Sequence, residues 1–312
     1  MSKKAVVTGG AGFIGSHVVE ELSRRDYQVA IFDNLNTGLS SNIEPFLRRK
    51  NVEFIQGSIT NLAVLKKVFS GADYIFHQAA VPSVPRSIED PKTSHNVNAT
   101  GTLNVLIAAR ENRVKKIIYA SSSSVYGDTP TLPKSEDMTP NPISPYAVSK
   151  LTGEYYCHVF QKVYGLKTVS LRYFNVYRPR QNPNSQYAAA IALFVKLVLE
   201  GKSPVIFGDG EQSRDFTFVK DVAEANIMAA ESDASGIYNI GNYRSVTIND
   251  LVKIIIDKVG NKEVRPIYKD IRPGDILHSL ADNTKAKSFG FQGRYSLEEG
   301  IAAVIDHLKK QA

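Results

Sequence analysis

A glycine-rich turn between an apolar strand and an amphipathic helix is the feature that most constrains the fold of this chain. The motif TGGAGFIG follows an apolar run at 5–8 and opens a predicted helix at 13–25. A side chain at Gly9 would obstruct the tight turn, one at Gly12 would push the backbone away from a pyrophosphate, and one at Gly15 would wedge the helix off the strand. The turn therefore predicts a dinucleotide site at the start of the first helix, although its GxxGxxG spacing differs from the more familiar GxGxxG.

An acidic residue stands where such a site binds ribose. Asp33 ends a predicted strand at 28–33 and lies 18 residues beyond Gly15. A carboxylate at this position accepts hydrogen bonds from the adenosine ribose hydroxyls and repels a 2′-phosphate. The pattern therefore favours NAD over NADP as the dinucleotide.

Short β-rich runs alternate with helical patterns through the first half of the chain. The predicted strands lie at 5–8, 28–33, 52–56, 73–78, 116–121 and 168–174, and the predicted helices at 13–25, 61–70, 93–112 and 145–164. Alternation at this pace predicts a parallel α/β sheet with right-handed crossovers. The remainder is less regular, with predicted helices near 187–200, 247–259 and 296–310 and short strands near 204–207 and 237–240.

The composition indicates an ordinary globular protein of one large domain or two coupled domains. The chain has 312 residues, and no apolar run reaches the roughly 18 residues of a membrane span. Its N-terminal residues lack the apolar stretch of a secretory signal. The net charge of +7 is scattered rather than clustered, so we expect neither nucleic acid nor a membrane as partner. The single cysteine, Cys157, excludes an intramolecular disulfide and is typical of a reduced, cytoplasmic protein. No metal site is predicted.

A tyrosine and a lysine share one face of the predicted helix at 145–164. In SPYAVSK, Tyr146 and Lys150 are four residues apart. A phenol with a pKa near 10 is a poor base, and lowering that pKa to about 7 requires roughly 4 kcal/mol of preferential phenolate stabilisation. A nearby ammonium and a cationic nicotinamide ring would supply it. The pair gains weight because it follows a dinucleotide turn and the four serines of YASSSSVYG at 119–127.

These motifs occur with others in one order along nearly the whole chain. They are TGGAGFIG, DNLNTG from Asp33, HQAA at 77–80, SVYG at 124–127, SPYAVSK, LRYFNVY at 171–177, SRDFTFV at 213–219 and RPGD at 272–275. The chain resembles the extended short-chain dehydrogenases/reductases, and within them the UDP-hexose 4-epimerases. The resemblance implies an α/β fold with a Rossmann doubly wound parallel sheet at 1–175, to which segments from about 209–250 return. It also implies a smaller mixed α/β domain at 176–312 that binds the nucleotide sugar.

The resemblance implies a catalytic set and a reaction. In the family, a hydroxyl residue four positions before the tyrosine of the VYG segment acts with the tyrosine and lysine, and here it is Ser122. Tyr146 would take the proton of the sugar 4-hydroxyl, and NAD would store the C4 hydride and return it to the other face of a 4-keto sugar. Related dehydratases carry acidic residues just after the serine position. Ser123 and Ser124 stand there instead, which disfavours elimination of water.

The binding residues implied by the resemblance fall into two groups. The cofactor group is Gly9, Gly12, Phe13, Ile14, Gly15, Asp33, Asn34, Asn36, Thr37, Gly38, Ser58, Ile59, Gln78, Ala79, Ala80, Asn98, Tyr146, Lys150 and Tyr173. The substrate group is Ser83, Val84, Ser122, Ser123, Ser124, Tyr146, Asn175, Arg214, Arg272, Asp275 and Ser279. Arg214 and Arg272 would face the diphosphate, whose oxygens match a guanidinium fork. Ser58 departs from the family, which commonly has an aspartate there for the adenine, so we expect a weaker adenine contact.

One position of the pocket wall indicates the sugar. In the family this resemblance points to, a tyrosine at this position is typical of epimerases restricted to glucose and galactose. This chain has Ser279 there, and a serine leaves room for an N-acetyl group. We therefore expect inversion of UDP-GlcNAc and UDP-GalNAc, and also of UDP-glucose and UDP-galactose. The alternative is a UDP-glucuronate 4-epimerase or decarboxylase, in which Arg86 would meet the carboxylate. A non-catalytic NAD or nucleotide-sugar binding module is a third possibility, although such proteins usually lose the tyrosine or the lysine.

The resemblance also bears on assembly. The predicted helices at 93–112 and 145–164 have apolar faces, part of which must cover the sheet. In the family these two helices pair across a homodimer interface. We therefore expect a homodimer.

Overall fold

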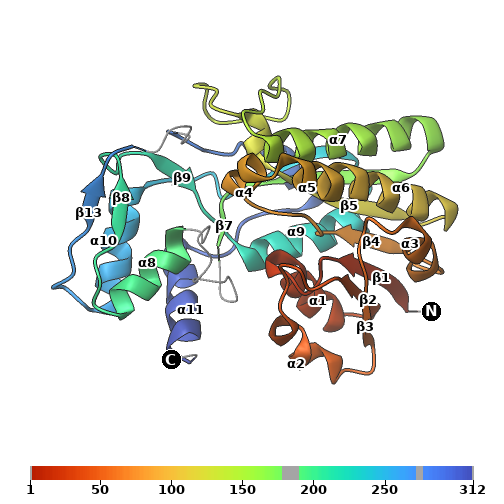
Figure 1. The fold of residues 1–312 in the computed structure, drawn as a ribbon, viewed down its shortest axis with the longest axis horizontal. Helices are drawn as coiled ribbons and strands as arrows, with labels where there is room; N and C mark the ends of the chain where they lie inside the picture. The colour runs from red at the N-terminus through yellow and green to blue at the C-terminus, as the bar shows by residue number, and fades with distance from the viewer. Residues whose placement is uncertain (1, 178–189, 272–276, 311–312) are drawn as a thin grey trace.

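The computed structural model describes residues 2–177, 190–271 and 277–310, and its centre is a seven-stranded parallel sheet. The strand order is β11-β6-β5-β4-β1-β2-β3, of which Figure 1 labels β5, β4, β1, β2 and β3. The strands are β1 (Lys3–Thr8), β2 (Tyr27–Asp33), β3 (Val52–Gln56), β4 (Tyr74–His77), β5 (Lys116–Ser122), β6 (Lys167–Tyr173) and β11 (Gly236–Ile240). This is the doubly wound, Rossmann-like arrangement that the alternation of strands and helices predicts.

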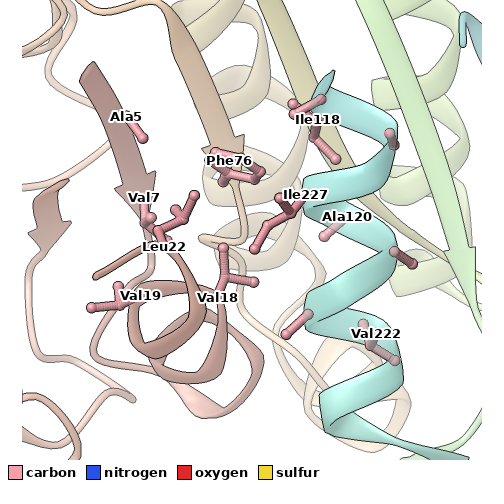
Figure 2. Close-up of a cluster of buried hydrophobic side chains, with 14 of the residues drawn as sticks. Ala5, Val7, Val18, Val19, Leu22, Phe76, Ile118, Ala120, Val222 and Ile227 are labelled. Atoms are coloured by element: carbon pink, nitrogen blue, oxygen red, sulfur yellow. The ribbon is translucent and has the colours of Figure 1, made fainter. Parts of the chain in front are cut away.

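Helices cover both faces of the sheet, which explains why its strands are apolar at consecutive positions. These helices are α1 (Phe13–Ser23), α2 (Glu44–Leu47), α3 (Leu62–Val68), α6 (Gly101–Glu111), α7 (Pro145–Tyr164) and α9 (Val219–Glu231). Helices α4 (Val84–Glu89) and α5 (Pro91–His95) pack against α7. In β1, Ala5 and Val7 pack in one core with side chains of α1 and α9, as Figure 2 shows. Val6, between them, packs in the opposite core with α3, α6 and α7. Burying a Val or Leu side chain contributes about 1.5–3 kcal/mol, so these two cores anchor the sheet.

Helix α7, which carries the tyrosine–lysine pair, has a clear sequence signal at each end. Ser144 caps the N-terminus by accepting the backbone N–H of Ala147 at 3.2 Å, and Pro145 occupies the first helical position, where the N–H has no helical partner. Gly165 ends the helix in a left-handed conformation, with φ of 70°. The predicted helix at 145–164 is confirmed.

Besides the short helices α2 and α4, which were not predicted, the structure differs from the predicted helices at residues 91–111 and at α9. The single helix predicted at 93–112 is instead α5, a π-helical turn at Asn96–Thr100 and α6 in direct succession. Helix α9 has no counterpart among the predicted elements. Alanines form much of its buried face, which also includes Asp221 and Asn226, so its apolar periodicity is weak.

A third apolar core lies at one end of the molecule, where α8, α10 and α11 pack together (Figure 1). The elements of this part are β7 (Val176–Tyr177), α8 (Ala190–Leu199), β8 (Val205–Phe207), β9 (Ser213–Asp215), β10 (Thr217–Phe218), β12 (Ser245–Thr247), α10 (Ile248–Val259), β13 (Ile267–Lys269) and α11 (Leu297–Lys309). The helices predicted near 187–200, 247–259 and 296–310 correspond to α8, α10 and α11, with 187–189 outside the described residues. Between these elements the chain returns to the central sheet, where α9 shares a core with α1 and β11 pairs with β6.

None of the helices that the structure describes is both long enough and apolar enough to cross a membrane.

Candidate active site

The glycine turn lies where the sheet order reverses, between β1 and β4. Gly9 adopts φ of 70°, and a Cβ there would lie 2.6 Å from the backbone of Ala79, just beyond β4. A Cβ on Gly15 would lie 2.1 Å from the Gly9 carbonyl oxygen, so α1 can approach the turn this closely only with glycine at that position. At Gly12 the one close neighbour of a Cβ would be that same oxygen, at 3.1 Å. Doubly wound sheets bind ligands in the crevice at such a reversal.

Asp33 ties the end of β2 to this turn. Its Oδ2 accepts the backbone N–H of Ala11 at 3.0 Å, and its Oδ1 accepts that of Leu35 at 2.8 Å. Burial raises the pKa of the Asp33 carboxyl, and the backbone hydrogen bonds oppose that rise. The carboxylate borders the cavity described next, where it is in position to accept hydrogen bonds from a ribose.

A cavity of about 240 Å³ runs from the glycine turn to Tyr146 and Lys150. All of the predicted cofactor residues line it except Gly38 and Asn98. A Cβ on Gly38 would lie 2.9 Å from the backbone of Ala11, so this glycine permits close packing behind the turn. The lining also includes residues that the sequence interpretation did not name: Phe32, Gly57, Val81, Pro82, Val97, Ala120 and Ser121.

Asn98 lies behind the cavity rather than in its wall. Its side chain accepts the backbone N–H of Val81 at 2.8 Å and donates to the Val81 carbonyl at 3.2 Å and to Ser149 Oγ at 3.0 Å. It is 1% exposed, and its predicted contact with the cofactor stays a prediction. Asn98 stands in the π-helical turn and holds Val81, a wall residue, in place.

The residues around this cavity fit a bound dinucleotide. The first turn of α1 offers backbone N–H groups and a glycine surface for a diphosphate, and Asp33 offers a carboxylate for a ribose. Tyr146, Lys150 and Tyr173 line the same cavity beyond the turn. The chain would therefore hold NAD with its diphosphate over α1 and its nicotinamide end beside the tyrosine–lysine pair.

The tyrosine–lysine pair meets the serine run at the carboxyl end of β5. Lys150 Nζ donates to the carbonyl of Ala120 at 2.8 Å and lies 5.9 Å from the centre of the Tyr146 ring. Burial lowers the pKa of Lys150 to about 8. Burial raises the pKa of Tyr146, and a hydrogen bond with the Ser122 side chain lowers it. The predicted catalytic residues Ser122, Tyr146 and Lys150 are thus brought together.

The four serines differ in their surroundings. Ser121 and Ser122 are the last residues of β5, and Ser123 and Ser124 begin a 3-10 turn. The Ser122 hydroxyl accepts hydrogen bonds from the backbone N–H of Ser124 at 3.2 Å and from its hydroxyl at 2.9 Å. Ser121 instead donates to Glu154 Oε1 on α7 at 2.5 Å. Two of the four serines therefore have different surroundings. Ser121 is bound to Glu154 of α7, whereas the Ser122 hydroxyl lies near Tyr146.

A second cavity, of about 320 Å³, contains two of the predicted substrate residues, Asn175 and Arg214. Asn175 Nδ2 donates to the carbonyl of Asp215 at 3.1 Å, and Arg214 Nη1 donates to the carbonyls of Ser213 and Leu277 at 2.9 and 3.1 Å. The rest of the wall is mostly apolar: Val176, Tyr177, Ala190, Ile191, Leu193, Phe194, Val205, Ile206, Phe207, Gln212, Phe216 and Ile248. Sequence reasoning did not name these residues, although the apolar run at 190–199 is a signal for four of them, Ala190, Ile191, Leu193 and Phe194.

Tyr146 lines the first cavity, and the other predicted substrate residues that the structure describes line neither cavity. Ser83 caps α4 with φ of 102°, and Val84 is 37% exposed. Ser279 is half-buried and donates its backbone N–H to the carbonyl of Ser213, beside Arg214. Ser122, Ser123 and Ser124 are outside both linings as well, and Arg272 and Asp275 lie outside the described residues.

The comparison with protein families gives one match that spans most of the chain. Residues 5–241 match the model of the NAD dependent epimerase/dehydratase family. That range includes the glycine turn, the serine run and the tyrosine–lysine pair, so it covers the first cavity entirely.

Individual proteins resemble the chain over its whole length. It is 40% identical over 306 residues to a putative UDP-glucose 4-epimerase of Methanocaldococcus jannaschii, covering 97% of this chain and 98% of the relative. A solved UDP-N-acetylglucosamine 4-epimerase from Methanobrevibacter ruminantium M1, in complex with UDP-N-acetylmuramic acid, is 43% identical with a TM-score of 0.96, covering 100% and 99% of the two chains. A UDP-glucuronic acid 4-epimerase from Bacillus cereus, solved with UDP-glucuronic acid and NAD, is 33% identical with a TM-score of 0.91, covering 99% and 100%.

Proposed function

Because this chain belongs to the NAD-dependent epimerase/dehydratase family, we propose that it is a UDP-sugar 4-epimerase, an enzyme that inverts C4 of a UDP-hexose. The three similar proteins named above are a putative UDP-glucose 4-epimerase, a UDP-N-acetylglucosamine 4-epimerase and a UDP-glucuronic acid 4-epimerase. They support the reaction and leave the sugar open. The observation that carries the proposal is that Tyr146 and Lys150 lie together in the wall of the NAD cavity, with Ser122 next in the chain to Ser121 of the same wall.

The roles of these three side chains follow from their surroundings. When bound, NAD supplies a hydride acceptor for C4 and a cationic ring close to Tyr146. The phenolic oxygen of Tyr146 takes the proton of the sugar 4-hydroxyl. It later returns a proton to the sugar 4-oxygen. The Lys150 ammonium lies over the Tyr146 ring and favours the phenolate, and Ser122 hydrogen-bonds the phenol. Tyr146 needs this help because burial alone raises its pKa.

The carboxylates near the site argue against a dehydratase. Among the described residues that line the first cavity, Asp33 is the one carboxylate, and it lies at the end of β2 with the glycine turn. Ser123 and Ser124 follow Ser122 and carry no acid group. Elimination of water requires a group that protonates the leaving hydroxyl. We therefore propose inversion without loss of water.

The expected test uses purified protein, NAD and a panel of UDP-sugars. We expect NMR of the products to detect the C4 epimer from at least one sugar, and no epimer from the Tyr146→Phe variant, which keeps the ring but loses the acid–base oxygen. A 4-keto-6-deoxy product would indicate a dehydratase, and a pentose product a decarboxylase. Absence of any product from the unmodified protein would contradict the proposed reaction.

For the sugar, we propose UDP-GlcNAc and UDP-GalNAc, with UDP-glucose and UDP-galactose as further substrates. Support comes from Ser279, whose backbone is bonded to Ser213 beside Arg214, and whose neighbour Ala281 packs with Tyr126 after the serine run. From these contacts we propose that the Ser279 side chain faces the sugar and that its small size leaves room for an acyl group.

The proposal that the size of residue 279 selects the sugar can be tested directly. We expect Ser279→Tyr to lower the rate on UDP-GlcNAc by at least about tenfold while the rate on UDP-glucose changes little, since one steric mismatch in a pocket is worth about 10–200-fold. Ser279→Ala is the matched control and should retain both rates. Equal losses of rate on both sugars would contradict the proposal that residue 279 selects the sugar by its size. Higher activity on UDP-glucuronate than on either sugar would favour the alternative function, with Arg86 as the first residue to examine.

We further propose that the enzyme is a cytoplasmic homodimer. Helix α7 presents an apolar stripe to solvent on the face opposite the sheet. The stripe consists of Val148, Tyr155, Val159 and Val163, which are 48%, 58%, 44% and 66% exposed. Their spacing of seven, four and four residues keeps them on one face of the helix. An exposed apolar stripe of this kind is typical of an interface. The buried free thiol of Cys157 supports a reducing compartment.

The dimer proposal predicts a change in mass. We expect light scattering to give twice the chain mass for the unmodified protein and the chain mass for a Val159→Glu/Val163→Lys double variant. Ile267→Glu, at an equally exposed apolar residue of β13, is the control and should stay dimeric. A double variant with the mass of the unmodified protein would contradict the proposed interface.

A further inference from the structure

A buried ion pair lies beneath the serine loop and has no part in the proposed chemistry. Arg172 of β6 donates from Nε to Glu154 Oε1 at 2.8 Å and from Nη2 to Oε2 at 2.7 Å. The side chains of Arg172 and Glu154 are 1% and 0% exposed. Replacing such a buried pair with apolar residues is often neutral for stability, so stability alone is a weak reason for it.

The pair is connected to the residue before Ser122. Ser121 Oγ donates to Glu154 Oε1 at 2.5 Å, and one helical turn earlier Lys150 Nζ donates to the carbonyl of Ala120 at 2.8 Å. Helix α7 therefore holds two successive residues at the end of β5 by two separate hydrogen bonds. Because Ser122 is next in the chain, these bonds restrict where its hydroxyl can lie relative to Tyr146, on the same helix.

The pair also restrains the far end of the serine loop. In the sheet register Arg172 is the partner of Ser121, and its guanidinium lies over the Tyr126 ring at 4.6 Å. Tyr126 ends the 3-10 turn that follows Ser122, and its hydroxyl donates to Asn239 Oδ1 of β11 at 2.7 Å. The loop is thus held by Glu154 at its start and by Arg172 at its end.

We propose that Glu154 and Arg172 are positioning residues that hold Ser122 within hydrogen-bond reach of Tyr146. The inference rests on the proposed 4-epimerase function, because it assigns the pair a role in that reaction. Neither side chain lines the NAD cavity, so neither is proposed to touch cofactor or substrate. A positioning role predicts that turnover falls when the restraint is lost even if the fold is retained.

The decisive variant is the double substitution Glu154→Leu/Arg172→Met, which removes both charges together and leaves neither partner unpaired. We expect its thermal midpoint to stay near that of the unmodified protein. Its kcat should fall by at least about tenfold, with the KM for the UDP-sugar changed less than about twofold, as expected for loss of an interaction specific to the reacting step. The acidic limb of its kcat–pH profile should move to higher pH, because a displaced Ser122 no longer favours the Tyr146 phenolate.

Two single variants keep the test decisive if the double variant does not fold. Ser121→Ala removes the link to the loop and leaves the ion pair intact, and we expect the same shift of the kcat–pH profile. Thr168→Val is the matched control, since Thr168 Oγ donates to the Cys157 carbonyl at 3.1 Å in the same contact between β6 and α7. It should lower the thermal midpoint and leave the kcat–pH profile unchanged.

The outcomes separate this inference from the function on which it rests. An unmodified protein that makes no C4 epimer would contradict the proposed function. An unmodified protein that turns over, together with an unchanged kcat–pH profile and kcat in Ser121→Ala and in a folded double variant, would overturn the positioning role alone. A kcat loss in Thr168→Val as large as that in Ser121→Ala would also overturn it, because any weakening of the contact would then suffice.

Discussion

At the scale of single residues, the site depends on a lysine that is buried as a cation. Lys150 is 4% exposed, and burial lowers its pKa from 10.5 to about 8. At pH values between about 8 and 10.5, the Lys150 side chain binds its proton more tightly in the unfolded chain than in the folded protein. The contribution of Lys150 to the free energy of unfolding is therefore unfavourable at neutral pH and improves as pH rises through this window.

This pH dependence of stability leads to a prediction for the Lys150→Met variant. We expect the variant to be inactive and to have a stability advantage over the unmodified protein that shrinks by about 2–3 kcal/mol between pH 7 and pH 10. Urea denaturation of both proteins at the two pH values measures the difference. Lys162→Met, at an exposed position on the same helix, is the matched control for loss of a lysine. A pH-independent difference for Lys150→Met would contradict the buried charge.

The serine run provides a second prediction at this scale. We expect Ser122→Ala to lower kcat by about 10²–10⁴-fold, the range for loss of an acid–base partner. Ser123→Ala, the adjacent control, should lower kcat by less than about tenfold, because Ser122 and not Ser123 lowers the pKa of Tyr146. Steady-state kinetics on the best UDP-sugar compares the two. A larger loss of kcat in Ser123→Ala than in Ser122→Ala would contradict the assignment of Ser122 as the hydroxyl that acts with Tyr146.

At the scale of elements, α7 is placed by its close approach to β5. Gly153 lies on the face of α7 that meets Tyr119, and a Cβ there would lie 2.2 Å from the Tyr119 hydroxyl oxygen and 2.4 Å from its Cζ. The same hydroxyl donates to the carbonyl of Lys150 at 3.2 Å. The helix can therefore sit at this distance from the strand only with glycine at 153.

This contact reverses the usual effect of a helical glycine. Gly→Ala within a helix normally stabilises by up to about 1 kcal/mol. We expect Gly153→Ala instead to destabilise by about 1–3 kcal/mol, as overpacking does, and to lower kcat because α7 carries Tyr146 and Lys150. Thermal denaturation and kinetics measure the two effects. Thr152→Ala, on the neighbouring and less buried position, should change neither by much, and a stabilised Gly153→Ala variant would contradict the steric argument.

At the scale of the whole molecule, Asp215 connects segments that are distant in sequence. Its carboxylate, 0% exposed, accepts the backbone N–H groups of Asn242, Tyr243 and Ala281 at 2.9, 3.0 and 3.1 Å. It thereby joins β9, which carries Arg214, to the loop after β11 and to the segment that contains Ser279. Burial raises the pKa of Asp215 to about 6 in spite of these bonds.

Removal of this carboxylate tests the connection. Asp215→Ala leaves three backbone N–H groups unpaired, so we expect a loss of about 2–5 kcal/mol in the free energy of unfolding. Because Arg214 would also lose its support, the KM for the UDP-sugar should rise more than the affinity for NAD falls. Urea denaturation, kinetics and NAD titration measure these quantities. Asp209→Ala, at an exposed aspartate nearby, should stay within about 0.5 kcal/mol of the unmodified protein. Equal effects of the two substitutions would contradict the proposed link.

Much of the central sheet was predictable because local patterns carry it. Consecutive apolar residues in β1 predict a strand buried on both faces, and Ser144, Pro145 and Gly165 mark both ends of α7. Helix α9 was not predictable in the same way, since alanines that contact α1 replace larger apolar residues on its buried face. The π-helical turn around Asn98 was not predictable either, because it depends on hydrogen bonds to Val81 and Ser149 from other segments.

By itself, the sequence determined the glycine turn, the acidic end of β2, the tyrosine–lysine spacing and the serine run, because each depends on neighbours within one or two turns of chain. Only the tertiary structure decided how these pieces meet. It divided the four serines between Glu154 and Tyr146, placed Asn98 behind the cavity wall, and formed the apolar second cavity from elements that are far apart in sequence. Such contacts depend on which faces pack together, and no local pattern of residues records that choice.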